Sequence, residues 1–215
     1  MQCLADWNVK NPDILVMAGA PTDNNATLFK QGYMSVLSPK FSDGSYKNAG
    51  EPAGTWDPAV ARTTFEEQFT AHNTINAVVT PNDDNANAVI SYLKSLNVPA
   101  KRFPTTGQDA TLTGMQNVLS GYQCGSVYKP IYLEAQAAVA LAVYLRAGET
   151  PPAALVNNTT RDSKQNADVP SVLLVPIWVT PKNMGETVVK DNFVSAAKLC
   201  AGNVAAACKA AGINP

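Results

Sequence analysis

The chain has 215 residues, with 16 Lys and Arg against 17 Asp and Glu, one His, and a charged fraction of 15%. This length suffices for one large domain or two small ones. The net charge of -1 argues against a nucleic-acid-binding protein, and no apolar stretch approaches the ~20 residues of a membrane span. The low charged fraction favours a secreted or cell-envelope protein. Residues 1–7 lack the basic and apolar regions of a signal peptide, so we expect export information elsewhere or a longer parent protein.

Short apolar runs alternate with segments of helical spacing along most of the chain. In chain order we predict strand 13–18, helix 26–37, strand 45–48, helix 58–71, strand 76–80, helix 85–96, strand 103–106, helix 112–119, strand 125–128, helix 130–146, an irregular stretch 151–169 and a strand pair in 171–179. Asp57 and Pro58 suit the N-cap and first position of the second helix. The alternation predicts an α/β fold with a doubly wound, mostly parallel sheet and helices on both faces.

Polar side chains follow successive predicted strands. They are Asp23, Asn24 and Asn25, then Trp56 and Asp57, then Asn82, Asp83 and Asp84, then Gln108 and Asp109, and finally Tyr128 and Lys129. Ligands of such sheets bind beyond the carboxyl ends of the strands. Amides and carboxylates hydrogen-bond hydroxyls, and an indole packs on the C–H face of a sugar ring. The set suits a neutral polyol better than a phosphate.

Several of these residues also have a simpler interpretation. Asp57 fits a helix cap, and so do the Asx residues at 23–25 and at 83 or 84. Trp56, in a Gly- and Pro-rich loop, is neither a cap nor an obvious core residue. His72, the single imidazole, is expected to be a solvated residue at a helix end.

The sequence does not predict an enzyme. No GxGxxG, P-loop, HExxH or GxSxG motif is present, and we expect no cofactor and no metal. A sugar-processing enzyme using Asp83 and Asp109 is kept as an alternative.

Two of the four cysteines, Cys200 and Cys208, lie eight residues apart in an Ala-rich tail. We predict a disulfide between them, which implies an oxidising compartment. Two free thiols on a helix are the alternative.

Several segments together resemble the periplasmic sugar-binding proteins of ABC importers, and most of all their D-xylose-binding branch. They are residues 19–29 (GAPTDNNATLF), the Trp56 loop, Asn82-Asp83, residues 106–110 (TGQDA), residues 127–130 (VYKP), residues 169–176 (VPSVLLVP) and residues 191–193 (DNF). The resemblance implies a type I periplasmic-binding-protein fold, in which a pentose binds between two lobes. Only the C-terminal lobe is expected here.

The resemblance also implies a domain plan and a set of ligand residues. Residues 1–127 would form the sugar-binding lobe, 128–150 a helix that packs on the absent N-terminal lobe, and 151–215 the return to the C-terminal lobe with the tail. The sugar contacts would be Asn24 or Asn25, Trp56, Asn82, Asp109 and Lys129, with Asp23, Asp83 and Gln108 as secondary candidates. Cys3 and Cys124 would both lie near the lobe boundary and form a second disulfide.

The implied location is periplasmic or extracellular. The implied partners are a monosaccharide, an ABC permease, and either the absent lobe or a second copy of the chain. The alternative of a different class is the effector-binding core of a LacI-like transcription repressor, which shares the fold.

The helix at 130–146 is apolar on every side, which is typical of a helix buried on every side. We expect it to dock on another lobe or a second copy, or to detach. The alternative is that it folds back onto its own sheet.

Overall fold

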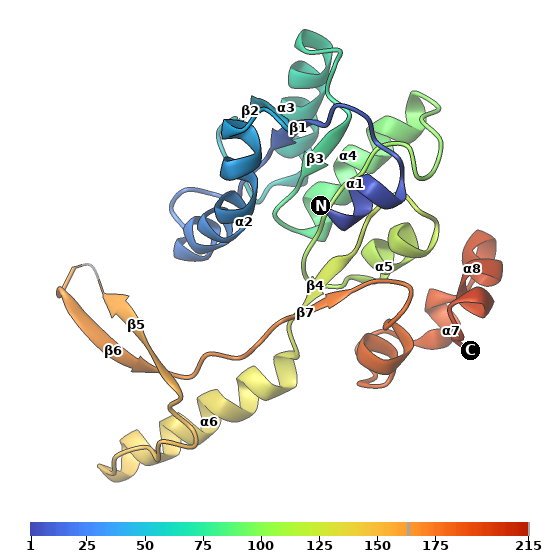
Figure 1. Cartoon of the computed structure of the whole chain (residues 1–215). Coiled ribbons are helices and arrows are strands. Elements are labelled where there is room, and N and C mark those ends of the chain that lie inside the picture. The colour runs from blue at the N-terminus through green and yellow to red at the C-terminus, as the bar shows by residue number, and fades with distance from the viewer. Residues whose placement is uncertain (163, 215) are drawn as a thin grey trace. The chain divides into compact units, whose positions relative to one another are not determined.

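The computed structural model describes residues 1–162 and 164–214 (Figure 1). The elements are α1 (Gln2–Asp6), β1 (Asp13–Val16), α2 (Asn24–Ser42), β2 (Lys47–Gly50), α3 (Pro58–Ala71), β3 (Ala77–Val79), α4 (Asp83–Ser95), α5 (Leu112–Leu119), β4 (Ser126–Tyr128), α6 (Ile131–Ala147), β5 (Asn158–Asp162), β6 (Ala167–Ser171), β7 (Ile177–Val179), a π-helical turn η1 (Gly185–Val189), α7 (Ala196–Leu199), a 3-10 turn η2 (Gly202–Val204) and α8 (Ala205–Ala210). No helix in the described ranges is long and apolar enough to cross a membrane.

The chain divides into two compact units. Unit 1 comprises Met1–Tyr128 and Trp178–Pro215, and unit 2 comprises Lys129–Ile177. This differs from the expected plan, in which the chain returns at residue 151. The stretch 151–177 belongs to the same compact unit as α6, and its strands β5 and β6 pair with each other. The chain rejoins unit 1 only at β7, which pairs with β4.

Unit 1 is built on a parallel sheet of order β2-β1-β3, so the α/β fold class is confirmed. Parallel bridges Val78↔Thr105 and Gln108↔Val127 continue the pattern beyond β3. The predicted strand 103–106 is wrong as a strand, since Thr105 forms only an isolated bridge. Pro104 has no N–H to donate, although its carbonyl accepts from Val78 N at 3.0 Å.

Helices cover both faces of this sheet (Figure 1). Successive side chains of a strand point to opposite faces, and all four residues of β1 are buried. Leu15 packs with α3 and α4 through Phe65 and Val89. Ile14 packs on the other face with Leu4 of α1 and Leu37 of α2.

The N-terminal helix caps that the sequence predicts are found in the structure, except at α4. Asp57 caps α3 by accepting from Ala59 N at 2.8 Å, as predicted. Helix α4 is capped by Asn82 and not by Asp83 or Asp84, because Asn82 has the extended backbone of an N-cap and accepts from Asn85 N at 3.0 Å. Helices α3 and α5 have the predicted bounds.

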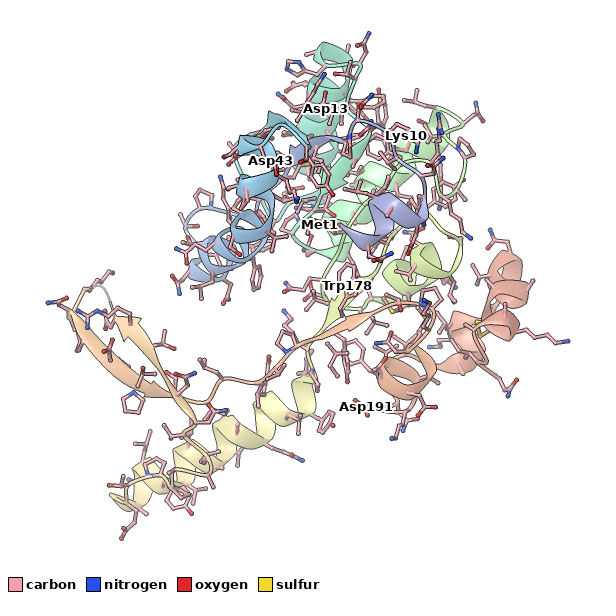
Figure 2. All side chains as sticks on the ribbon, viewed as in Figure 1. Met1, Lys10, Asp13, Asp43, Trp178 and Asp191 are labelled. Atoms are coloured by element: carbon pink, nitrogen blue, oxygen red, sulfur yellow. A yellow bond between two sulfur atoms is a disulfide. The ribbon has the colours of Figure 1, made fainter. Side chains whose placement is uncertain are left out.

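Two disulfides, Cys3–Cys124 and Cys200–Cys208, confirm both predicted pairs. The first joins α1 to the segment before β4, and the second closes the tail. The tail packs on the rest of unit 1, since Gln116 Nε2 of α5 donates to Lys198 O at 3.2 Å. The Tyr128 hydroxyl donates to Asp191 at 3.1 Å, and Trp178 lies against Gly125. Trp178 and Asp191 are labelled in Figure 2.

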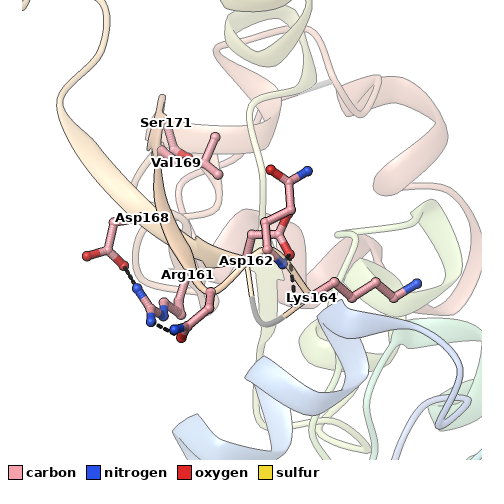
Figure 3. A network of polar contacts seen from close by, with 8 residues as sticks. Arg161, Asp162, Lys164, Asp168, Val169 and Ser171 are labelled. Atoms are coloured by element: carbon pink, nitrogen blue, oxygen red, sulfur yellow. Dashed lines mark hydrogen bonds and ion pairs between the residues drawn. The ribbon is translucent and has the colours of Figure 1, made fainter.

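Unit 2 consists of α6 and an antiparallel β5–β6 hairpin. The irregular stretch predicted at 151–169 is therefore wrong, and of the strand pair predicted at 171–179 only β7 is found. Arg161 of β5 bonds Asp168 at 3.2 Å and also Asn166 (Figure 3). No residue of α6 is buried, and the docking of this helix on another lobe or on a second copy stays a prediction.

Candidate functional site

The carboxyl ends of the unit 1 strands form one hydrogen-bonded edge, which we call the carboxyl edge: residues 17–19, 55–56, 80–82, 106–109 and 127–128. Met17 N donates to Val79 O, and Thr55 N to Ala18 O, at 2.9 and 3.0 Å. Thr80 N donates to Thr106 Oγ1 at 3.0 Å. Asp109 N donates to Val127 O at 2.8 Å. Strand ends far apart in sequence are thus fixed side by side.

Trp56 is held at this edge by its ring and by its N–H. The indole lies against Gly19, where a Cβ would overlap Trp56 Cζ2 and Cη2. Its Nε1 donates to Asp23 Oδ2 at 3.1 Å. Asp23 also caps α2 by accepting from Asn25 N at 2.8 Å. Asp23 therefore orients Trp56 from the start of a helix, and the indole stays half-buried.

Asn82 and Asp109 are both half-buried at the same edge. The cap of α4 uses Asn82 Oδ1, so Nδ2 is the group that this side chain offers a hydroxyl. Asp109 has a backbone φ of +91° and the next residue, Ala110, a φ of +48°. Consecutive left-handed residues other than glycine are rare and concentrate at functional sites.

The remaining predicted ligands are placed as follows. Asn24 and Asn25 are exposed in the first turn of α2, directly after Asp23. Lys129 is half-buried and is the first residue of unit 2, directly after β4.

Two secondary candidates point inward. Asp83 is 0% exposed and Gln108 is 7% exposed. The Asp83 carboxylate accepts from Ser126 Oγ at 2.7 Å, Gln123 Nε2 at 2.8 Å and Thr111 N at 2.8 Å. Burial raises the pKa of this carboxyl, and these hydrogen bonds act in the opposite direction. Asp83 is thus enclosed by protein donors, which disfavours its use with Asp109 in glycoside chemistry.

Two contributors to the carboxyl edge were missed from the sequence. Asn85 Nδ2 donates to Thr55 O at 2.9 Å and so anchors the loop that carries Trp56. Gly54 packs on the Gly19 carbonyl, where a Cβ would overlap the oxygen. The only signal available in the sequence was the glycine itself, in the Gly- and Pro-rich loop before Trp56, because Asn85 looks like any polar residue in a first helical turn. Within the described ranges, no group of three or more His, Cys, Asp or Glu side chains could hold a metal ion.

Comparison with known proteins agrees with this architecture. Residues 1–150 match the family model described as a periplasmic binding protein domain. The chain is 39% identical over 188 residues to the D-xylose-binding periplasmic protein of Escherichia coli K12, covering 86% of this chain and 55% of that protein. It is 30% identical over 200 residues to the multiple sugar-binding periplasmic receptor ChvE of Rhizobium radiobacter, covering 87% and 56%.

Among solved structures, a carbohydrate transporter solute-binding protein from Chloroflexus aurantiacus in complex with D-glucose superimposes with a TM-score of 0.79. The identity is 24%, over 92% of this chain and 65% of that one. The chain spans about half the length of the two periplasmic relatives. With the family model matching well over half of the sequence and the parallel sheet carrying helices on both faces, the chain belongs to the periplasmic binding protein family.

Proposed function

We propose that this chain is the C-terminal sugar-binding lobe of the solute-binding component of an ABC sugar importer. The observation that carries the proposal is the carboxyl edge, where hydrogen bonds between strand ends gather Trp56, Asn82 and Asp109. An indole face, an amide and a carboxylate match the C–H face and the hydroxyls of a monosaccharide.

The ligand in this proposal is a pentose, with D-xylose as the probe. The named relatives include a D-xylose-binding protein and a receptor for several sugars, which supports a monosaccharide. Asn24, Asn25 and Lys129 complete the proposed contacts. In this proposal a second lobe, which the longer relatives have room for, closes over the sugar.

The proposed location is the periplasm, and the proposed macromolecular partner is an ABC permease. Both disulfides support an oxidising compartment. They disfavour the alternative of a cytosolic repressor core, where thiols stay reduced. In this proposal the protein binds the sugar and releases it unchanged.

The test is an NMR titration of the 215-residue chain with D-xylose, D-glucose and, as a control, glycerol. We expect D-xylose to shift the amide signals of Asn82 and Asp109 and the indole signal of Trp56, with no sugar product in the mixture. NMR detects the weak binding expected of half a site. Shifts confined to residues away from the carboxyl edge, or no response to either sugar, would contradict the proposal.

Replacing Trp56 with Ala supplies the matched variant. Loss of a stacking contact should weaken D-xylose binding by about 1 kcal/mol or more. Leu96→Ala, at an exposed position after α4, should leave binding unchanged. An unchanged affinity in Trp56→Ala would rule out the stacking role.

A further inference from the structure

A buried polar cluster lies directly behind the carboxyl edge of unit 1. Its centre is the Asp83 carboxylate, which receives hydrogen bonds from Ser126, Gln123 and Thr111. Asp83, Gln123 and Ser126 are between 0% and 1% exposed. The three donors come from the segment before β4, from β4 itself and from the cap of α5, so the cluster joins three elements.

The surrounding backbone leaves room for this carboxylate and for little else. A Cβ on Gly107 would overlap Asp83 Oδ1, and a Cβ on Gly114 would overlap Asp83 Oδ2. Glycines that approach from two sides enclose the carboxylate closely. A buried polar network stabilises a single arrangement when its members are satisfied. Both carboxylate oxygens of Asp83 accept hydrogen bonds here, whereas Gln123 Oε1 has no partner among the described residues.

The cluster continues into the turn that carries Asp109. Ser126 Oγ donates to Asp83 Oδ1 and also accepts from Ala110 N at 3.0 Å. Thr111 N, one residue further on, donates to Asp83 Oδ2. The two residues that follow Asp109 are therefore fixed by the Asp83–Ser126 pair.

The turn needs such support because of its backbone conformation. Asp109 and Ala110 both have positive φ values, +91° and +48°. Such residues are costly and persist only where the surroundings determine the conformation. On the other side, Asp109 N donates to Val127 O, next to Ser126.

We propose that Asp83 and Ser126 are positioning residues, which hold Asp109 in its left-handed conformation at the carboxyl edge and so set the sugar affinity. The proposal rests on the proposed function, in which Asp109 contacts the sugar. Asp83 and Ser126 themselves do not touch the ligand. They act through the backbone of residues 109–111.

The first arm of the test is independent of sugar. In Ser126→Ala the hydroxyl that joins Ala110 N to Asp83 is lost, and we expect the Cα and Cβ chemical shifts of Asp109 and Ala110 to leave their left-handed values. The matched control is Ser120→Ala. It removes a hydroxyl at the C-terminal end of α5 that donates to Gln116 O at 2.8 Å. Unchanged shifts at 109 and 110 in Ser126→Ala would overturn the proposal.

The second arm separates positioning from a general structural role. We expect Ser126→Ala to weaken D-xylose binding about tenfold, because the loss of a buried hydrogen-bond partner has an effect of this size. In an Asp109→Asn background the same substitution should change binding less than about twofold, because the group it positions is already altered. Equal effects in both backgrounds would mean that Ser126 only stabilises the fold.

Asp83→Asn provides an independent variant of the same pair. The amide would turn N–H groups toward protein donors, so we expect the shift changes at 109 and 110 seen in Ser126→Ala. If Asp83→Asn fails to fold, the Ser126→Ala arms decide the proposal. If the unsubstituted chain shows no D-xylose binding, the proposed function fails, while the shifts still decide whether the pair holds the turn.

Discussion

Gly19 lies under the indole of Trp56, and this single contact offers a way to move the ring without removing it. Gly19→Ala places a methyl group in the space of Cζ2 and Cη2. We expect the indole to swing away, the Nε1–Asp23 hydrogen bond to break, and stability to fall by about 1–3 kcal/mol from overpacking. The indole NMR signal of Trp56 and the D-xylose response report the displacement.

The control for this variant is Gly32→Ala in α2, where nothing lies within 4 Å of the added Cβ. It should leave the Trp56 signal in place and raise helix stability by up to about 1 kcal/mol. A Trp56 signal that is unmoved in Gly19→Ala would show that the ring does not depend on this contact.

Tyr33 is a second residue whose environment has a measurable consequence. Its hydroxyl is buried without a hydrogen-bond partner among the described residues, and burial, together with the charge of Glu51, raises the pKa of Tyr33 to about 12. The unfolded chain therefore loses this proton first, near pH 10. The contribution of Tyr33 to the free energy of unfolding is fully present below about pH 10, and it should fall as the pH rises from there toward 12.

Absorbance at 295 nm should show a late tyrosine titration near pH 12, and Tyr33→Phe should lower its amplitude by the contribution of one tyrosine. Because the substitution also removes an unsatisfied hydroxyl, we expect neutral-pH stability to stay equal or rise by up to about 1 kcal/mol. Tyr46→Phe, which packs against the same cluster, is the matched control. A late step of unchanged amplitude in Tyr33→Phe would contradict the assignment.

At the scale of elements, the segments that the sequence predicted well are those whose local signals agree with their burial. The Asp57-Pro58 start and the periodic apolar positions predicted α3 to the residue. The strand β1 was predicted from the short apolar run that begins at Ile14, and all four of its residues are buried in the structure. The positions at the carboxyl edge followed from the order of these elements.

The failures have physical causes that no local pattern carries. Hairpin β5–β6 has polar or exposed residues on both faces and includes Pro170, paired with Thr159, so it lacks the alternation that marks a strand. The Asp83–Ser126 pair joins residues 43 apart through a buried contact. The sequence suggested Asp83 as a cap, but the α4 cap is Asn82, and the Asp83 carboxylate is buried behind the carboxyl edge.

Helix α6 yields a prediction at this scale. Val139, Val143 and Leu145 are 64%, 62% and 69% exposed, and none of its residues is buried. Soluble monomers rarely tolerate a large apolar patch. We expect the mass in solution to rise with protein concentration as such surfaces associate.

The double variant Val139→Glu, Val143→Glu should raise the dissociation constant of that association at least about tenfold. The control is Val36→Glu with Val60→Glu, two exposed valines on α2 and α3. Analytical ultracentrifugation over a range of concentrations checks both. A strictly monomeric parent chain, with α6 protected from hydrogen exchange, would contradict the expectation.

At the scale of the whole molecule, the two disulfides should differ in their effect on stability. Cys3–Cys124 closes a loop of 121 residues and Cys200–Cys208 a loop of 8. In the chain-entropy model, removing the first costs about 5 kcal/mol and removing the second about 2.5 kcal/mol. Urea unfolding of the two double Cys→Ala variants measures the difference, and a larger loss for the tail pair would refute it.

Unit 1 is assembled from two segments that flank unit 2 in the sequence, and this has a consequence for the order of events during synthesis. The segment after unit 2 packs over α5 and includes the buried Leu199 and Val204. While the ribosome is still making unit 2, α5 has no such cover, and β4 has not yet met its partner β7. Unit 1 therefore completes its fold only after the residues that follow unit 2 have been made, which keeps this part of the nascent chain open while unit 2 is synthesised.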